Sequence, residues 1–427
     1  MASSAARARR KGSEVPGERV GSLWIALIAL SNLGLFMAYF GVLGVLLPDQ
    51  VQVVAGPAHK VIAFGLVTGL GAVFAMIANP VAGALSDRTT GRFGRRHPWI
   101  LGGALVSAGA LLLLAQQRSI FGIAVMWCLG QVGLNTMQAG IVAGIPDHVP
   151  VNQRGAVSGW FGLPQVIGVV VAVALVSKVA TGSAGYALLA ITVVGLALPF
   201  VLFTQDVALP HTSRSAFSAF SMRTFFRAFW LSPAKFPDFG WAWLTRFLIV
   251  LGNSMAVLYL LYFLRDKIQY SRLFPGQTAE DGLVILLLIC TILAVTMAVV
   301  GGRVSDRTGR RRWLVAISGV VMAIPAVVLA CSPNWPTTIG AAAILGAGFG
   351  IYLSVDQALV IHVLPSVAGR AKDLGVISVA SSAAQAMAPA IAAPVVAHLG
   401  GYSALYLWVA AILILGSITV TRIRSVP

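Results

Sequence analysis

The stretch Ser86–Arg96 (SDRTTGRFGRR) separates two long apolar runs, and a closely similar stretch, Ser305–Arg311 (SDRTGRR), separates two later ones. The aspartates of the two copies are 219 residues apart (306 − 87). Two further pairs keep this spacing, namely Gln138 with Gln357 and Pro146 with Pro365. Three points at one spacing indicate two related halves, because self-similarity at a fixed period marks a repeat.

The composition predicts a membrane protein. Of the 427 residues, 58% are hydrophobic and 10% are charged, and the mean hydropathy is +0.88, whereas a soluble domain carries roughly 25% charged residues. The net charge of +17 lies mainly in short loops between apolar runs. The orientation rule for membrane proteins explains this charge, so no nucleic-acid partner is expected. The three cysteines show no metal-ligand spacing, and we expect neither a metal nor a cofactor.

A membrane span needs about 20 mostly apolar residues, because the hydrocarbon core is roughly 30 Å thick and a helix rises 1.5 Å per residue. This rule predicts an all-α protein with twelve transmembrane helices in two pseudo-symmetric six-helix bundles, 22–204 and 240–421. The predicted spans are 22–47, 61–85, 99–116, 120–146, 156–178, 185–204, 240–264, 282–302, 313–331, 337–364, 374–397 and 402–421.

The distribution of basic residues predicts the orientation. Of the 30 Lys and Arg residues, 23 fall in segments on the side of the N-terminus, 6 fall on the other side, and Arg246 lies within a span. Since cytoplasmic loops carry the excess of Lys and Arg, we predict a monomeric multi-pass protein of the cell (plasma or inner) membrane with both termini in the cytoplasm. The first apolar run is interpreted as a retained anchor and not as a signal peptide.

Three segments lie outside the predicted bundles. Residues 1–21 are predicted to be a disordered basic N-terminus, and residues 422–427 a short C-terminus, both in the cytoplasm. Residues 205–239 mix Arg and Lys with Phe and Trp, which predicts an amphipathic linker on the anionic inner leaflet. A regulatory docking site is the alternative interpretation of this linker.

The loop motif resembles that of a known family. Gly302–Arg311 resembles the cytoplasmic motif between spans 8 and 9 of the major facilitator superfamily. Gly83–Pro98 is a longer variant, similar to the one in the glycoside–pentoside–hexuronide:cation symporters and the sucrose-transporter group. Asp356–Leu359 and Lys372–Gly375 are similar to bacterial relatives of that group. The resemblance implies a twelve-span secondary transporter, with a sugar or glycoside as its substrate.

A gating role for the motif has a physical basis. An aspartate beside a glycine-containing turn can accept hydrogen bonds from free N–H groups at a neighbouring helix start, and nearby arginines can bind carboxylates or lipid phosphate. By resemblance, Asp87 would latch onto the start of span 11 and Asp306 onto the start of span 5. The alternative is that the arginines only set the topology. The predicted gating motif comprises Gly83, Asp87, Arg88, Gly91, Arg95, Arg96, Gly302, Asp306, Arg307, Gly309, Arg310 and Arg311.

Two charges lie inside predicted spans, where each costs about 2.5–3.5 kcal/mol. Arg246 and Asp356 have similar depths, roughly 10 and 12 Å from the cytoplasmic side. In facilitator-type proteins, spans 1, 4, 7 and 10 line the central cavity, so both residues are expected there. We predict a charge pair or a water-filled site, with Asp356 as the proton-binding candidate. The alternative is a static ion pair that joins spans 7 and 10.

Uncharged polar residues recur at helical spacing. Gln131, Asn135 and Gln138 share one face of span 4. Asn32 and Tyr39 in span 1 are seven residues apart, as are Arg246 and Asn253 in span 7, so each pair also shares a face. Such groups suit a hydroxyl-rich solute, and aromatic rings at Tyr39, Trp160 or Tyr352 could stack on a sugar. The alternative is hydrogen bonding between packed helices, which we favour for the stripe of Ser378, Ser381, Ser382 and Gln385 in span 11. The predicted substrate and proton cavity comprises Asn32, Tyr39, Gln131, Asn135, Gln138, Arg246, Asn253, Tyr352, Asp356 and Gln357.

The main hypothesis is therefore proton-coupled transport of a sugar or glycoside by alternating access. Sodium coupling is disfavoured, because the interior of span 2 offers Asn79 but no acidic residue, whereas melibiose-type symporters carry acids there. Proton-driven export of a hydrophobic metabolite or drug is the alternative. An enzyme is not expected, since the six histidines are scattered and no phosphate-binding glycine loop occurs. A channel is disfavoured by the lack of a charged ring or filter loop.

Overall fold

The computed structural model describes residues 19–90, 93–150, 153–206, 236–363 and 370–424, and in these residues the regular structure is helical. Its α-helices are α2 (Ser22–Gly41), α3 (Leu47–Ser86), α4 (His97–Leu114), α5 (Ile120–His148), α6 (Arg154–Lys178), α7 (Gly182–Phe203), α9 (Pro237–Leu258), α10 (Leu260–Phe263), α11 (Tyr270–Leu273), α12 (Ala279–Thr308), α13 (Arg311–Cys331), α14 (Trp335–Val363), α15 (Arg370–His398) and α16 (Gly401–Val420). Two π-helical turns, η1 (Val42–Leu46) and η3 (Leu264–Ile268), extend α2 and α10.

Each predicted span coincides with a helix, and most boundaries differ by only a few residues. The largest difference concerns the first span, which continues through η1 into α3 and passes the predicted end at residue 47. Pro48 does not end the helix, because membrane helices tolerate proline where a local π turn, here η1, lets the backbone groups find other partners. The chain reverses only at Gly56, whose φ of 76° breaks α3 in two. Positive φ values are accessible to glycine at little cost.

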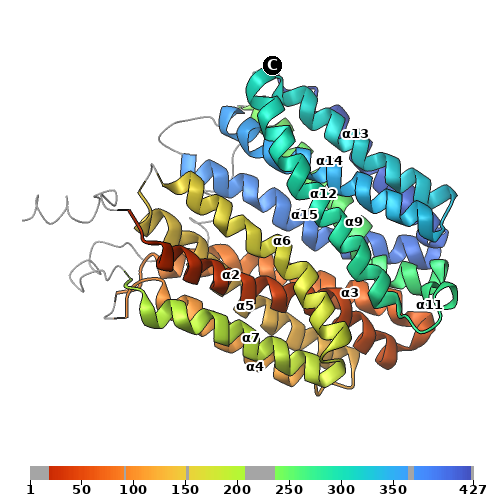
Figure 1. Ribbon diagram of the computed structural model, residues 1–427, viewed down its shortest axis with the longest axis horizontal. Helices are drawn as coiled ribbons and strands as arrows, with labels where there is room; N and C mark the ends of the chain where they lie inside the picture. The colour runs from red at the N-terminus through yellow and green to blue at the C-terminus, as the bar shows by residue number, and fades with distance from the viewer. Residues whose placement is uncertain (1–18, 91–92, 151–152, 207–235, 364–369, 425–427) are drawn as a thin grey trace, which may run out of the picture.

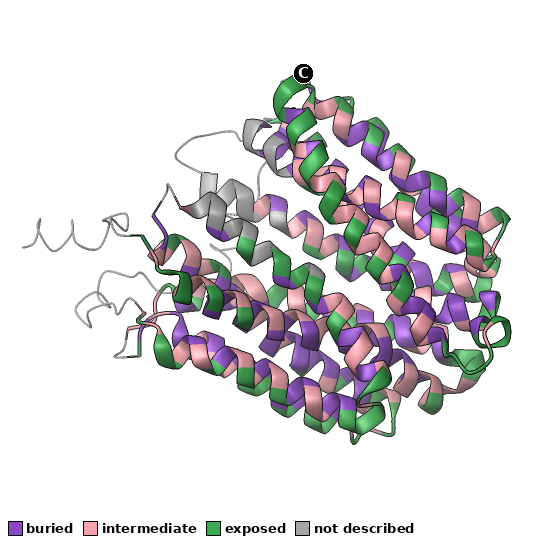
Figure 2. Ribbon diagram, in the orientation of Figure 1, coloured by how far each residue is buried: buried purple, intermediate pink, exposed green. Residues whose placement is uncertain are grey.

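The surface of the protein is that of a membrane protein. Ten stretches of the described helices are long and apolar enough to cross a bilayer, and the first of them, Ser22–Ser86, contains two predicted spans. Large apolar side chains remain exposed along the outer faces, for example Leu112 (48% exposed), Ile292 (52%) and Ile317 (52%) (Figure 2). Lipid is as apolar as these side chains, so exposure there costs little. The prediction of an all-α membrane protein is confirmed.

The helices pack in the same order in the two halves of the chain. In the first half α3 packs on α5, α5 on α4, α4 on α7, α7 on α2 and α2 on α6. In the second half α12 packs on α14, α14 on α13, α13 on α16, α16 on α9 and α9 on α15. Each helix of the first series is the repeat counterpart of the helix at the same place in the second series. The packing therefore follows the pseudo-symmetry that the duplicated motif predicts.

Two seams join the halves, with α3 against α15 and α6 against α12 (Figure 1). These seams are also related by the repeat, since α3 corresponds to α12 and α6 to α15. We call the end of the helices that carries Ser86–Arg96 and Thr308–Arg311 the motif end. The opposite end, which carries α10, η3 and α11, is the far end; α11 marks it at the right of Figure 1.

Candidate functional site

A buried ion pair lies inside the second half of the protein. Arg246 of α9 places its Nη1 3.4 Å from Oδ2 of Asp356 on α14, and the two side chains are 15% and 6% exposed. The Nε of Arg246 donates a hydrogen bond of 3.0 Å to the hydroxyl of Ser381 on α15. Tyr352, one turn before Asp356 on α14, is 1% exposed. The predicted pair is thus brought together, and three helices contribute to it.

This arrangement has a defined chemistry. A buried ion pair is stable only while both charges are present, since removing one leaves the other uncompensated in a medium of low dielectric constant. A carboxyl such as that of Asp356 can take up a proton, and its neutralisation would release the Arg246 Nη donors, which could then bind hydroxyl or carboxylate oxygens. Arg246 could therefore exchange its contact with Asp356 for a contact with a solute.

The polar face predicted in span 4 makes contacts of its own. The Nδ2 of Asn135 donates to the backbone oxygen of Gln131 at 2.9 Å and to its Oε1 at 3.3 Å. The Nδ2 of Asn79 on α3 donates to Oε1 of Gln138 on α5 at 3.4 Å. The bond between Asn79 and Gln138 therefore joins α3 to α5, whereas those of Asn135 stay within α5. Asn135 and Gln138 remain half-buried, whereas Gln131 is 2% exposed.

The remaining predicted cavity residues are spread over three helices. Asn32 on α2 is fully buried, and Tyr39 on the same helix is half-buried, with its ring 6.4 Å from that of Trp127. Asn253 on α9 is half-buried, and Gln357 lies in α14 with its side chain outside the described part of the chain. Trp160, offered as a stacking surface, is 60% exposed on α6.

The first motif copy forms an ion-pair cluster with the end of α5. Both carboxylate oxygens of Asp147 accept from Nη2 of Arg95 at 2.8 Å, and Oδ2 accepts from Nε of Arg96 at 2.7 Å. Arg96 also donates to Asp87 at 2.6 Å. Burial disfavours the charged guanidinium, but Asp147 and Asp87 outweigh this effect and raise the pKa of Arg96. The cluster therefore holds a permanently charged arginine.

A further carboxylate anchors this cluster to the end of α7. Asp206, whose side chain is 1% exposed, accepts hydrogen bonds from the backbone N–H groups of Arg96 and His97, the latter at 2.9 Å. The N-terminus of a helix favours a negative charge at this place. Gly94, with a φ of 83°, packs directly against Asp206 and leaves no room for a side chain. The motif loop is thus fixed to α4, to α5 and to Asp206, three residues after the end of α7.

The second motif copy is more open. Asp306, Arg307 and Arg310 are exposed, and Gly309 ends α12 in the left-handed conformation, with a φ of 66°. Gly302 and Arg311 are half-buried at the same end, as are Gly83 and Arg88 in the first copy, whereas Gly91 lies outside the described residues. The side chains at the starts of α6 and α15 are also outside them, so the latches of Asp87 and Asp306 remain predictions.

Ion pairs between the two halves hold the far end together. The Nζ of Lys60 on α3 lies 2.6 Å from Oδ1 of Asp266 in η3. Arg265 pairs with Asp49 from the first half and with Glu280 of α12. Burial works against the charge of Arg265, yet these two carboxylates raise its pKa. Lys178 and Asp281 form a further pair across the seam of α6 and α12.

Aromatic side chains fill the space beside these charges. The hydroxyl of Tyr259 donates to the backbone oxygen of Val61 at 3.3 Å, and that of Tyr262 donates to Pro48 at 2.8 Å. The ring of Phe64 lies 5.6 Å from both tyrosine rings. The two halves are therefore in direct contact at the far end.

Sequence reasoning missed this far-end closure. It did not predict that Asp49 of the first half pairs with Arg265 of the second. The available signal was the crowding of Asp266, Glu280 and Asp281 between two spans, in a chain with only 13 acidic residues.

Comparison with known proteins gives a family match over most of the chain. The profile of the Major Facilitator Superfamily matches residues 20–310 and 277–427. A gentisate transporter of Corynebacterium glutamicum is 29% identical over 139 residues, which are 33% of this chain and 29% of that protein. An uncharacterized symporter of Synechocystis sp. is 51% identical over 41 residues, which are 10% of this chain and 8% of that protein. The matched regions thus span less than a third of these curated relatives.

Solved structures resemble the whole chain. The nucleoside transporter NupG has a TM-score of 0.70 at 14% identity, covering 94% of this chain and 99% of that one. A peptide transporter, POT, in complex with sulfate has a TM-score of 0.73 at 14% identity, covering 96% of both chains. At such identities the likeness concerns the fold alone.

Proposed function

Since this chain belongs to the Major Facilitator Superfamily, we propose that it is a secondary active transporter that moves a small solute across the cell membrane by alternating access. The proposed moving parts are the bundles 22–204 and 240–421, joined by the linker 205–239. The excess of Lys and Arg at the motif end supports a cytoplasmic location for that end and for both termini.

The far-end contacts support one state of this cycle. Lys60 with Asp266, and Arg265 with Asp49, join the halves on the side opposite the motif. A transporter that is closed on one side exposes its site to the other. We therefore infer that the structure represents the state in which the solute site faces the cytoplasm.

The solute that fits best is a sugar or glycoside. Half-buried amides at Asn135, Gln138 and Asn253 provide donors and acceptors, and Tyr39 provides a ring. Such groups bind hydroxyl-rich, uncharged molecules through several weak bonds. The resemblance of Gly83–Pro98 to sugar-symporter motifs supports the same substrate class.

The ion pair of Arg246 and Asp356 is the single observation that supports proton coupling. A carboxylate inside a membrane bundle is costly and is retained where it binds ions or protons. In the proposed cycle, Asp356 is protonated from the outside, Arg246 then contacts the solute, and release of the proton to the cytoplasm restores the pair.

Counterflow into proteoliposomes tests this function. A panel of labelled disaccharides is assayed with and without an inward proton gradient, using the full-length chain. We expect exchange of at least one sugar, and accumulation of that sugar only with the gradient. Flat signals for every sugar, together with proton-dependent extrusion of an apolar dye, would instead support export of a hydrophobic compound.

A small aromatic acid is the second candidate solute. The partial match to a gentisate transporter favours it, and Arg246 offers a guanidinium that can bind a carboxylate. Labelled gentisate therefore belongs in the same panel, and exchange of gentisate without exchange of any sugar would favour this candidate.

A further inference from the structure

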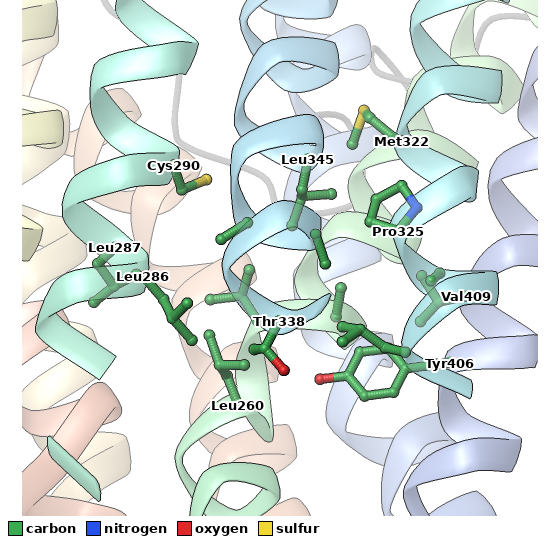
Figure 3. Close-up of a pocket in the computed structure, with 16 residues that line it drawn as sticks. Leu260, Leu286, Leu287, Cys290, Met322, Pro325, Thr338, Leu345, Tyr406 and Val409 are labelled. Carbon is green, nitrogen blue, oxygen red and sulfur yellow. The ribbon is translucent and has the colours of Figure 1, made fainter. Parts of the chain in front are cut away.

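A partly enclosed apolar cavity lies inside the second half of the protein, away from the polar residues described above. Its walls come from α9, α10, α12, α13, α14 and α16 (Figure 3). It offers about 50 Å³ to the centre of a water-sized sphere, whereas a single buried water needs roughly 10–15 Å³ by this measure. The cavity therefore has room for a small organic molecule.

The walls are almost entirely apolar. Leu286, Met322, Leu345 and Val409 surround the space, and the residues that line it include no charged side chain. An ion would lose its hydration here without compensation. A neutral occupant is thus required, and cavities lined in this way bind small aromatic molecules readily.

One wall carries a hydrogen-bond donor without a partner. Tyr406 is 2% exposed, and its Oη makes no hydrogen bond within the described part of the chain. Figure 3 shows this oxygen directed into the cavity toward the oxygen of Thr338. Thr338, 1% exposed, donates its own proton to the backbone oxygen of Asn334 at 2.7 Å, so its oxygen is left as an acceptor.

These two oxygens define what the occupant must carry. A hydroxyl group between them would accept from Tyr406 and donate to Thr338. Buried polar groups are costly to leave unpaired, which favours an occupant with such a group. We propose that this cavity is a binding site for a small neutral aromatic alcohol of about the size of phenol.

The site differs in kind from the proposed transport site. All of its walls belong to one half, so its occupant would move with that half and would not be passed from one side of the membrane to the other. It also borders the break between α9 and α10 through Val257 and Leu260. The inference therefore goes beyond the proposed function and stands whether or not a sugar is carried.

Binding of 4-fluorophenol tests the proposal. The probe is titrated into the purified full-length protein in detergent micelles and followed by ¹⁹F NMR, with fluorobenzene as the matched probe that lacks the hydroxyl. We expect one saturable site for 4-fluorophenol, weakened about tenfold by Tyr406→Phe, since one hydrogen bond is lost. The same substitution should leave the affinity for fluorobenzene unchanged.

Two further variants serve as controls. Tyr402→Phe, one turn away on α16 and bonded to Asp266 at the far end, should not change binding. Ala341→Leu fills the cavity and should remove saturable binding of both probes. Absence of saturable 4-fluorophenol binding, equal affinity in Tyr406→Phe, or binding retained in a folded Ala341→Leu protein would each overturn the proposal. If Ala341→Leu does not fold, the comparison of the two probes in Tyr406→Phe decides.

Discussion

The guanidinium of Arg246 and the carboxylate of Asp356 lie 3.4 Å apart on two helices of the same half, α9 and α14. This pair can therefore form and break without any relative movement of the two halves. The seams between the halves are made elsewhere, by α3 with α15 and α6 with α12. Protonation of Asp356 would consequently act first on Arg246, which also contacts the seam helix α15 through its hydrogen bond to Ser381.

Asp356→Asn should separate exchange from coupling. The variant mimics a protonated carboxyl, so solute counterflow should persist while accumulation driven by a proton gradient is lost. Both activities are measured in proteoliposomes. Gradient-driven accumulation at the wild-type level in Asp356→Asn would show that another group carries the proton.

Arg246→Gln tests whether the pair is only a structural contact. Loss of one partner leaves a buried charge, which costs about 3–5 kcal/mol of stability. The double variant Arg246→Gln with Asp356→Asn should regain much of this stability in thermal unfolding, yet should not transport. Recovered transport in the double variant would mean that the two residues serve only to join α9 and α14.

The carboxylates of the motif cluster should differ in their effects. Asp147 is 18% exposed and accepts from two arginines, so Asp147→Asn should destabilise the protein by about 1.5–3 kcal/mol. Asp87 is 59% exposed, and Asp87→Asn should leave the protein inserted and folded but reduce uptake. Thermal unfolding and uptake are measured for both. Unchanged uptake in Asp87→Asn would exclude the latch role of this residue.

Gly65 offers a test of the seam between α3 and α15. A Cβ at this position would lie 2.8 Å from Oη of Tyr259 and 3.1 Å from the backbone oxygen of Pro389, with Ala393 still closer. Gly65→Ala should therefore open the far end and make thiol reagents reach it faster. Gly69→Ala, one turn along, meets only Pro389 at 3.9 Å and is the matched control. Equal thiol accessibility in both variants would argue against far-end closure at this seam.

The ion pair of Lys60 and Asp266 provides an independent test of the same closure. Lys60 is 8% exposed and Asp266 is 36% exposed, so the pair should contribute about 1 kcal/mol to the closed state. Asp266→Asn should raise far-end accessibility about fivefold, and the exchange of the two charges, Lys60→Asp with Asp266→Lys, should restore the wild-type value in part. If the change in far-end accessibility of the double variant equals the sum of the changes in the two single variants, the two side chains do not interact.

The sequence was sufficient for the fold because its signals are physical requirements of the bilayer. Apolar runs of span length and a duplicated motif predict helices and their pairing into halves, and both agree with the structure. The depth of Arg246 and Asp356 in their spans predicted their proximity, since helical rise converts position into depth. The predicted end of the first span was wrong because Pro48 lies inside a continuous helix, where a proline does not mark the boundary.

The contacts across the far end could not be predicted in the same way. Lys60 and Asp266 are 206 residues apart, and charge counts give the side of the membrane but not the partner. The cavity beside Tyr406 was equally hidden, because its walls come from six helices and its residues are ordinary apolar ones. The polar stripe of α5 is a further case, because helical spacing places Asn135 on the predicted face but does not show that its amide donates to Gln131 of the same helix.

The distances between the halves at their two ends test alternation most directly. Spin labels at Phe121 and Leu399 report on the far end, and labels at Phe93 and Trp313 report on the motif end; all four side chains are exposed. On addition of the transported solute, we expect the far-end distance to lengthen in part of the molecules while the motif-end distance shortens in the same proportion. Distances that stay fixed, or that change in the same sense at both ends while transport proceeds, would contradict the account.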